Sequence, residues 1–121
     1  MDPINLQDKL AQFDEHWAPR IVAELNGQHV KLAKMAGALD WHHHPDADEL
    51  FLVLSGTLVV ERRDADDVRL EEGECCVVPS GVEHRPVAVD GEAHVLLFEP
   101  ADTRNTGTRD TDRTVPDPER I

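Results

Sequence analysis

The chain has 121 residues, of which 40% are hydrophobic and 31% charged, and its formal net charge at pH 7 is −13. This length fits one domain, the negative charge makes nucleic acid and anionic membranes poor partners, and no apolar run approaches the roughly 20 residues that span a bilayer. The first five residues lack the basic start and apolar core of a signal peptide, so we expect a cytoplasmic protein.

The N-terminal segment, residues 1–19, predicts a short helix. Asn5 can cap a helix that extends to Phe13, because Leu6, Leu10 and Phe13 recur at helical spacing. Pro19 separates this segment from the remainder of the chain.

From residue 20 the hydrophobic period changes to that of strands. Residues 21–25 and 29–35 flank Asn26-Gly27, the strongest two-residue hairpin signal, because both positions tolerate a positive φ. Residues 49–54 are apolar on both faces, which suits a strand covered on both sides. Ser55-Gly56 is then expected to turn the chain into another β-rich run.

Short strands continue to about residue 99. We expect two of them at residues 68–70 and 75–78. Residues 85–89 and 93–98 are expected to pair with each other across Asp90-Gly91, a second hairpin dipeptide. Many short strands with closely spaced turn signals predict an all-β barrel or sandwich over residues 20–99.

The C-terminal tail, residues 100–121, has a different composition. Thr, Asp, Arg, Gly and Pro dominate, and few apolar residues occur. Such a segment cannot bury much surface by itself, so it either lies across the barrel or is partly disordered.

Four residues carry the chemistry that the sequence predicts. His42 and His44 share one face if their segment is a strand, and Glu49 can return to the same interior point after a loop. His84 follows Pro79-Ser80-Gly81 at the start of a strand and is the best candidate for a third imidazole. Three imidazoles and one carboxylate suit one divalent transition metal, such as Fe, Mn, Ni, Cu or Zn.

Neighbouring residues have more ordinary interpretations. Phe51 and Val53 share the face of Glu49 by alternation, so we expect them to line an apolar pocket beside the metal. Trp41 is expected to point outward and to pack under the N-terminal segment, and His43 to be exposed to solvent. No residue is assigned a catalytic role.

The sequence contains two motifs that resemble those of the cupins, which are small double-stranded β-helix (jelly-roll) proteins. The first motif holds three of the four residues. One residue separates His42 from His44, four residues lead on to Glu49, and six more lead to Gly56. Gly37 stands one residue closer to His42 than the cupin pattern prefers.

The second motif resembles its cupin counterpart in the same way. Five residues separate Gly73 from Pro79, Gly81 follows, and two residues lead to His84. Ala88 occupies the position of a final Asn. Since neither Gly37 nor Ala88 is a ligand position, the resemblance implies a cupin barrel with a short N-terminal helix, an extended C-terminal tail and a metal site.

The resemblance leaves the function open, because this fold supports many chemistries. Similar small cupins of the cupin-2 type are often labelled isomerase-like, after mannose-6-phosphate isomerase, or dioxygenase-like. A redox metal would activate dioxygen on a chelating small molecule, whereas a Lewis-acid metal would polarise a carbonyl and assist isomerisation or hydrolysis. The alternative is a non-catalytic module that binds a metal and a small ligand. We also expect a homodimer, because several strands are apolar on both faces and similar cupins commonly pair sheet against sheet.

Overall fold

The computed structural model describes all 121 residues and contains one short helix, α1 (Leu6–Leu10). Asn5 caps it as predicted, since its side chain accepts a hydrogen bond of 3.0 Å from the backbone N–H of Asp8. The helix ends at Leu10 with Ala11 as its C-cap, three residues earlier than expected, and the carbonyl of Phe13 accepts a hydrogen bond of 2.6 Å from Lys34 Nζ. No helix here has the length or hydropathy to cross a membrane.

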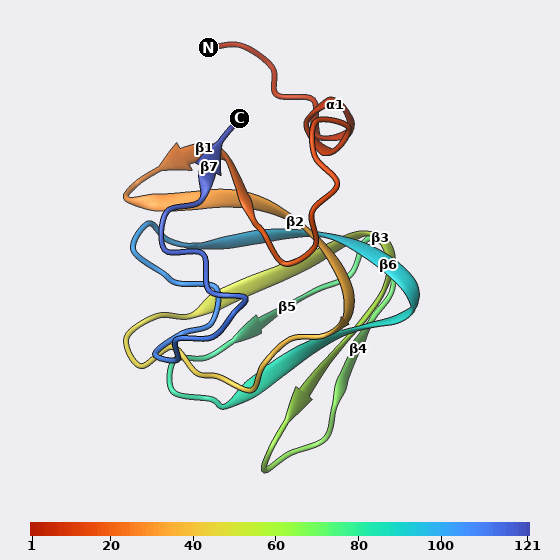
Figure 1. The fold of residues 1–121 in the computed structure, drawn as a ribbon, viewed down its shortest axis with the longest axis vertical. Coiled ribbons are helices and arrows are strands. Elements are labelled where there is room, and N and C mark those ends of the chain that lie inside the picture. The colour runs from red at the N-terminus through yellow and green to blue at the C-terminus, as the bar shows by residue number, and fades with distance from the viewer.

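Seven strands build a single sheet that rolls into a barrel (Figure 1). The strand order is β4-β3-β6-β2-β1-β7, and β5 also pairs with β3. All pairings are antiparallel except the short one between β1 and β7. The strands are β1 (Arg20–Leu25), β2 (Gln28–Ala38), β3 (Glu49–Arg62), β4 (Val68–Leu70), β5 (Cys75–Val78), β6 (His84–Pro100) and β7 (Glu119–Arg120). The predicted all-β class is therefore confirmed, as is the hairpin at Asn26-Gly27.

Two predicted turns are wrong. Ser55-Gly56 does not reverse the chain, because β3 runs through it from Glu49 to Arg62. Residues 85–89 and 93–98 do not pair with each other either, since both belong to β6 and pair with β2 and β3. The residues that suggested turns instead mark register shifts in long strands, where the sheet bends to close the barrel.

Gly56 shows why this bend needs a glycine. Its φ is +86°, and a Cβ placed there would lie 2.7 Å from the carbonyl oxygen of Glu92 and 3.0 Å from Cα of Ala93. Both the backbone conformation and the close approach of β6 therefore exclude larger residues. The glycine-bearing dipeptides of β3 and β6 thus meet at one corner of the sheet.

The core has an inner and an outer part. The inner cluster fills the barrel and includes Phe51, Val53 and Val95, which are at most 2% exposed. The outer cluster is smaller and forms where α1 covers the outside of β2, with Leu10 and Leu32 at its centre. The N-terminal segment thus covers part of the outer face of the sheet.

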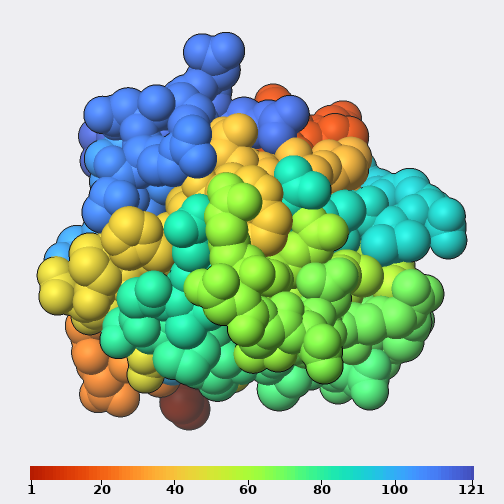
Figure 2. Space-filling model, turned by 90° about the horizontal axis from the view of Figure 1, so that it is seen from below, coloured from red at the N-terminus to blue at the C-terminus, as the bar shows by residue number.

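The C-terminal tail lies against the barrel rather than extending from it. Figure 1 shows it in blue, running along one side of the barrel to β7 beside β1, and Figure 2 shows it side by side with the yellow segment that precedes β3. Arg109 and Arg113 donate hydrogen bonds to the carbonyls of Trp41 and Ala38. Gly107, with φ +59°, packs so closely on the backbone of His43 that a Cβ would overlap its carbonyl oxygen.

Candidate metal centre

The structure brings His42, His44, Glu49 and His84 together, and we call these four residues the His/Glu cluster. His42 and His44 lie in the loop between β2 and β3, Glu49 is the first residue of β3, and His84 is the first residue of β6. The two histidines of the loop therefore do not lie in a regular strand, as the sequence suggested. They converge because the loop is fixed to β6.

Backbone hydrogen bonds hold the loop in this position. His42 and His84 form an isolated antiparallel bridge, in which each N–H donates to the carbonyl of the other at 3.0 and 2.9 Å. The carbonyl of His44 also accepts a hydrogen bond of 2.8 Å from the N–H of Gly81. Backbone hydrogen bonds alone thus join the two motifs.

The ligand atoms of the His/Glu cluster have the spacing of a coordination site. All four lie within 4.8 Å of one another, and Oε1 of Glu49 is 3.4 Å from Nε2 of both His44 and His84. Ligand atoms bound at about 2.1 Å to one ion lie roughly 3 to 4 Å apart. The four residues are at most 5% exposed, so their arrangement is fixed by packing.

Hydrogen bonds also set which imidazole nitrogen faces the centre. Nδ1 of His42 lies 2.8 Å from the carbonyl oxygen of Asp40, and Nδ1 of His84 lies 2.8 Å from that of Val82. A carbonyl oxygen can only accept, so each Nδ1 carries the proton and donates it. Each Nε2 is therefore left with its lone pair directed to the centre.

Electrostatics keep these ligands in the metal-binding forms. Burial, followed by the positive charge that His84 would carry, lowers the pKa of His42 to about 4, so its imidazole is neutral at pH 7. Burial opposes ionisation of Glu49, but the nearby polar groups of Glu99, His44 and His84 hold the pKa of its carboxyl well below the usual range. The cluster thus offers a neutral imidazole and a carboxylate.

Three atoms of the cluster lack any partner in the chain. Nε2 of His44, Oε1 of Glu49 and Nε2 of His84 are buried and make no hydrogen bond. Leaving one buried polar atom unsatisfied costs about 1–3 kcal/mol, so three at one point require an explanation. A divalent cation at their centre would satisfy all three at once, and the mixed nitrogen and oxygen donors fit a transition metal.

Two buried charged residues beside the cluster were missed by the sequence analysis. Lys31 and Glu99 are each 1% exposed, and Lys31 Nζ donates to Glu99 Oε1 at 2.9 Å. Burial and the neighbouring charge of Glu49 raise the pKa of Glu99 well above its usual range. Alternation was a usable signal, since Lys31 shares a strand face with Ala33 and Glu99 shares one with Leu97, and both of those residues are in the core.

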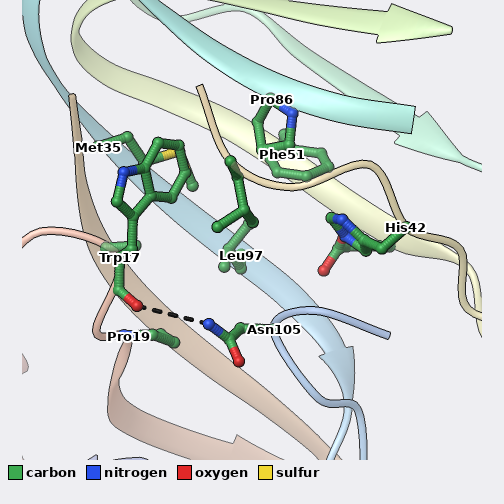
Figure 3. Close-up of a pocket in the computed structure, with 11 residues that line it drawn as sticks. Trp17, Pro19, Met35, His42, Phe51, Pro86, Leu97 and Asn105 are labelled. Carbon is green, nitrogen blue, oxygen red and sulfur yellow. Dashed lines mark hydrogen bonds between the residues drawn. The ribbon is translucent and has the colours of Figure 1, made fainter. Parts of the chain in front are cut away.

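A small apolar pocket adjoins the His/Glu cluster, with about 20 Å³ of enclosed space and about 340 Å³ when the solvent-open mouth is counted (Figure 3). His42 and Glu49 form one side of it, and Trp17 lies across the cavity from His42. Asn105 brings the C-terminal tail to the rim, where its side-chain amide donates to the carbonyls of Trp17 and Arg113 at 3.4 and 2.7 Å. The lining residues are Trp17, Pro19, Ala33, Met35, Leu39, His42, Glu49, Phe51, Pro86, Leu97 and Asn105.

The structure can also be compared with the predictions for Phe51, Val53 and Trp41. Phe51 lines the cavity, whereas Val53 is fully buried in the core and is not part of the lining. Trp41 does not pack under the N-terminal segment. Its ring instead lies 4.2 and 5.1 Å from the guanidinium carbons of Arg63 and Arg85, because cation–π stacking on the outer surface holds it there.

Comparisons with known proteins agree with this architecture. A family model described as a cupin domain matches residues 28–99, which hold both motifs. A cupin-2 domain protein of Shewanella frigidimarina has a solved structure that is 44% identical, with a TM-score of 0.77 over 80% of this chain and 93% of that one. The protein NMB1881 of Neisseria meningitidis is 32% identical, with a TM-score of 0.75 over 83% of this chain and all of that one (100%).

One curated relative is also similar in sequence. YdbB of Bacillus subtilis is 42% identical over 64 residues, which is 53% of this chain. The match spans little more than half of YdbB, 57% of its length.

Proposed function

Because the chain belongs to the cupin domain family (Cupin_2), we propose that it binds one divalent transition metal and uses it to oxidise a small, largely apolar molecule with dioxygen. The observation that carries the metal is the convergence of three buried, unpartnered ligand atoms in the His/Glu cluster. Bound Fe(II) would supply dioxygen activation, and four protein ligands leave room for substrate on a five- or six-coordinate ion.

The cavity supports a substrate with an apolar body. Eight of its eleven lining residues are Trp, Pro, Ala, Met, Leu or Phe, and Trp17 and Phe51 offer broad flat surfaces. A sugar phosphate would find neither lysine nor arginine in this lining. We therefore infer a neutral chelating molecule that carries its oxygen-bearing groups on its metal-facing end.

The lining also favours oxidation over isomerisation. Isomerisation needs a base that moves a proton, and the titratable side chains of the lining are His42 and Glu49, which are metal ligands in this proposal. Oxidation with dioxygen requires no such base. The chain needs only to bind the substrate, orient the substrate towards the ion and exclude water. Trp17 and Asn105 would serve the last two tasks by closing the cavity on the side of the tail.

Oxygen uptake tests this function. Protein loaded anaerobically with Fe(II) should consume dioxygen when a catechol or a β-diketone, both small neutral chelators, is added. A Zn(II)-loaded sample of the same protein should show no uptake. If both probes bind and perturb the spectrum of the Co(II) form, yet neither supports oxygen uptake or isomer formation with any metal, the barrel is a binding module, which is the second candidate.

We also propose that the protein forms a homodimer through the outer face of its sheet. Val30, Phe98, Leu50 and Val77 lie in one row across β2, β6, β3 and β5, and Val77 is 55% exposed. A chain of net charge −13 repels its own copies, so self-association requires an uncharged face such as this row.

Light scattering at micromolar concentration should give twice the chain mass for the wild-type protein. The double variant L50E/V77E places two carboxylates in the row and should give the monomer mass while keeping its metal. The double variant A65E/R69E, which adds two carboxylates at exposed positions in and beside β4, is the control and should leave the dimer intact. A wild-type monomer would contradict the proposal.

A further inference from the structure

The barrel interior contains a buried ion pair to which the proposed function assigns no role. Lys31 on β2 and Glu99 on β6 point inward and are each 1% exposed. Lys31 Nζ donates to Glu99 Oε1 at 2.9 Å and to the carbonyl of Thr103 at 3.1 Å. The ammonium group is thus fixed between a strand and the first turn of the tail.

Stability alone does not explain this pair. Removing two charges from water costs several kcal/mol per ion, and an apolar pair of similar volume is often as stable or more stable. The neighbouring inward positions of the same strands hold Ala33 and Leu97, as expected for a barrel core. The polar side chains at positions 31 and 99 are therefore best explained by a third polar group nearby, which an apolar pair could not bind.

That partner is the carboxylate of Glu49. Leu50 and Phe98 are paired across β3 and β6, so Glu49 and Glu99 occupy adjacent positions in the next row, and both side chains point inward. The two carboxyl groups lie close enough that each shifts the pKa of the other, downward for Glu49 and upward for Glu99. Oε2 of Glu99 is buried and has no hydrogen-bond partner in the chain, since Lys31 is bound to Oε1, so a proton on Oε2 could be donated only towards Glu49.

We propose that Lys31 and Glu99 are positioning residues that hold the Glu49 carboxylate in its metal-binding orientation. Lys31 fixes Glu99, and Glu99 fixes Glu49 so that Oε1 faces Nε2 of His44 and His84. Carboxylate ligands that lack such a partner rotate, and the loss of an outer-shell partner typically lowers metal affinity 10- to 100-fold. This inference rests on the metal-binding part of the proposed function.

Titration of the full-length protein with Co(II), followed by its visible absorption, tests the inference without any substrate. The double variant K31M/E99L replaces the ion pair by an apolar pair and retains the packed volume. K34M is the matched control: Lys34 is a second buried lysine of β2, 7% exposed, but it lies on the outer face and binds the carbonyl of Phe13.

We expect K31M/E99L to melt cooperatively, to bind Co(II) 10- to 100-fold more weakly than the wild type, and to show a shifted absorption band. K34M should keep the wild-type affinity and spectrum even if its melting temperature falls. Wild-type affinity and spectrum in K31M/E99L would overturn the inference. A wild-type protein that binds no Co(II) would instead overturn the proposed function.

A second comparison keeps the test decisive if the double variant does not fold. In E99Q the amide can still accept from Lys31 and donate to Glu49, so its affinity should stay within about threefold of wild type. E99D retains the carboxyl group but is one methylene shorter, cannot reach both partners, and should lose about tenfold. Equal affinities of E99Q, E99D and the wild-type protein would overturn the inference.

Discussion

His84→Ala is expected to lower the affinity for a divalent metal by at least about a hundredfold, which exceeds the loss from outer-shell partners because a direct ligand disappears. His84 is fully buried, its Nε2 lies 3.4 Å from Oε1 of Glu49, and its Nδ1 proton is fixed on the carbonyl of Val82. No other side chain can replace it at that point. Isothermal titration with Zn(II) or Co(II) gives the comparison.

The control for this variant is His43→Ala. His43 neighbours two members of the His/Glu cluster along the chain but is not one of them. The His43→Ala variant should therefore bind metal with wild-type affinity. Unchanged affinity in His84→Ala, with a normal melting curve, would show that the four residues do not form the metal site.

The metal-free protein is expected to lose about 2 kcal/mol of stability between pH 7.5 and pH 5 through His42 alone. The pKa of this imidazole is about 4 in the folded protein against 6.5 for an ordinary histidine. Between these values the unfolded chain binds a proton that the folded chain rejects, so acidification favours unfolding. The loss begins as the pH falls through 6.5 and is complete near pH 4.

Urea unfolding of protein kept in a chelator measures this effect at both pH values. His42→Asn has no imidazole to protonate, so its stability should change by about 2 kcal/mol less over the same interval. The difference between the two proteins isolates His42 from every other titrating group. Equal pH slopes for the wild type and His42→Asn would contradict the assigned pKa.

Spacing along the sequence predicted which four residues converge in the His/Glu cluster, because spacing reflects backbone geometry. The two motifs place His42 and His84 on segments that are joined by backbone hydrogen bonds, and Gly81 supplies a further bond to this loop. A feature whose residues lie close together in the sequence, such as a helix cap or the three cluster residues of the first motif, can therefore be predicted from residue order. The all-β class followed in the same way from the strand period.

The predicted turns at Ser55-Gly56 and Asp90-Gly91 failed for a related physical reason, whereas the hairpin at Asn26-Gly27 is confirmed. Asp90-Gly91 has the positive φ values of a hairpin turn, +57° and +117°, yet the strand continues through it. The same dihedral angles serve a bend within a strand when the neighbouring strand bends beside it, as β3 does at Gly56. Dipeptide signals give local conformation, whereas the pairing partner is decided by contacts far away in the sequence.

The cavity was the hardest part to predict, because its walls come from distant segments. Trp17 precedes the barrel and Asn105 follows it, and only the folded tail brings them within 3.4 Å. No period or motif connects these two residues. Lys31 and Glu99, in contrast, stood at inward positions of recognisable strands, and attention to alternation alone would have identified them.

The paired backbone bonds between His42 and His84 have a practical consequence. Small zinc domains collapse when their ion is removed, because the ion itself assembles the fold. Here the sheet assembles the ligands, so chelation should strip the protein and leave it folded, and a different ion can then be added back. A single purified batch would thus allow iron, manganese, nickel, copper and zinc to be compared in one unchanged scaffold.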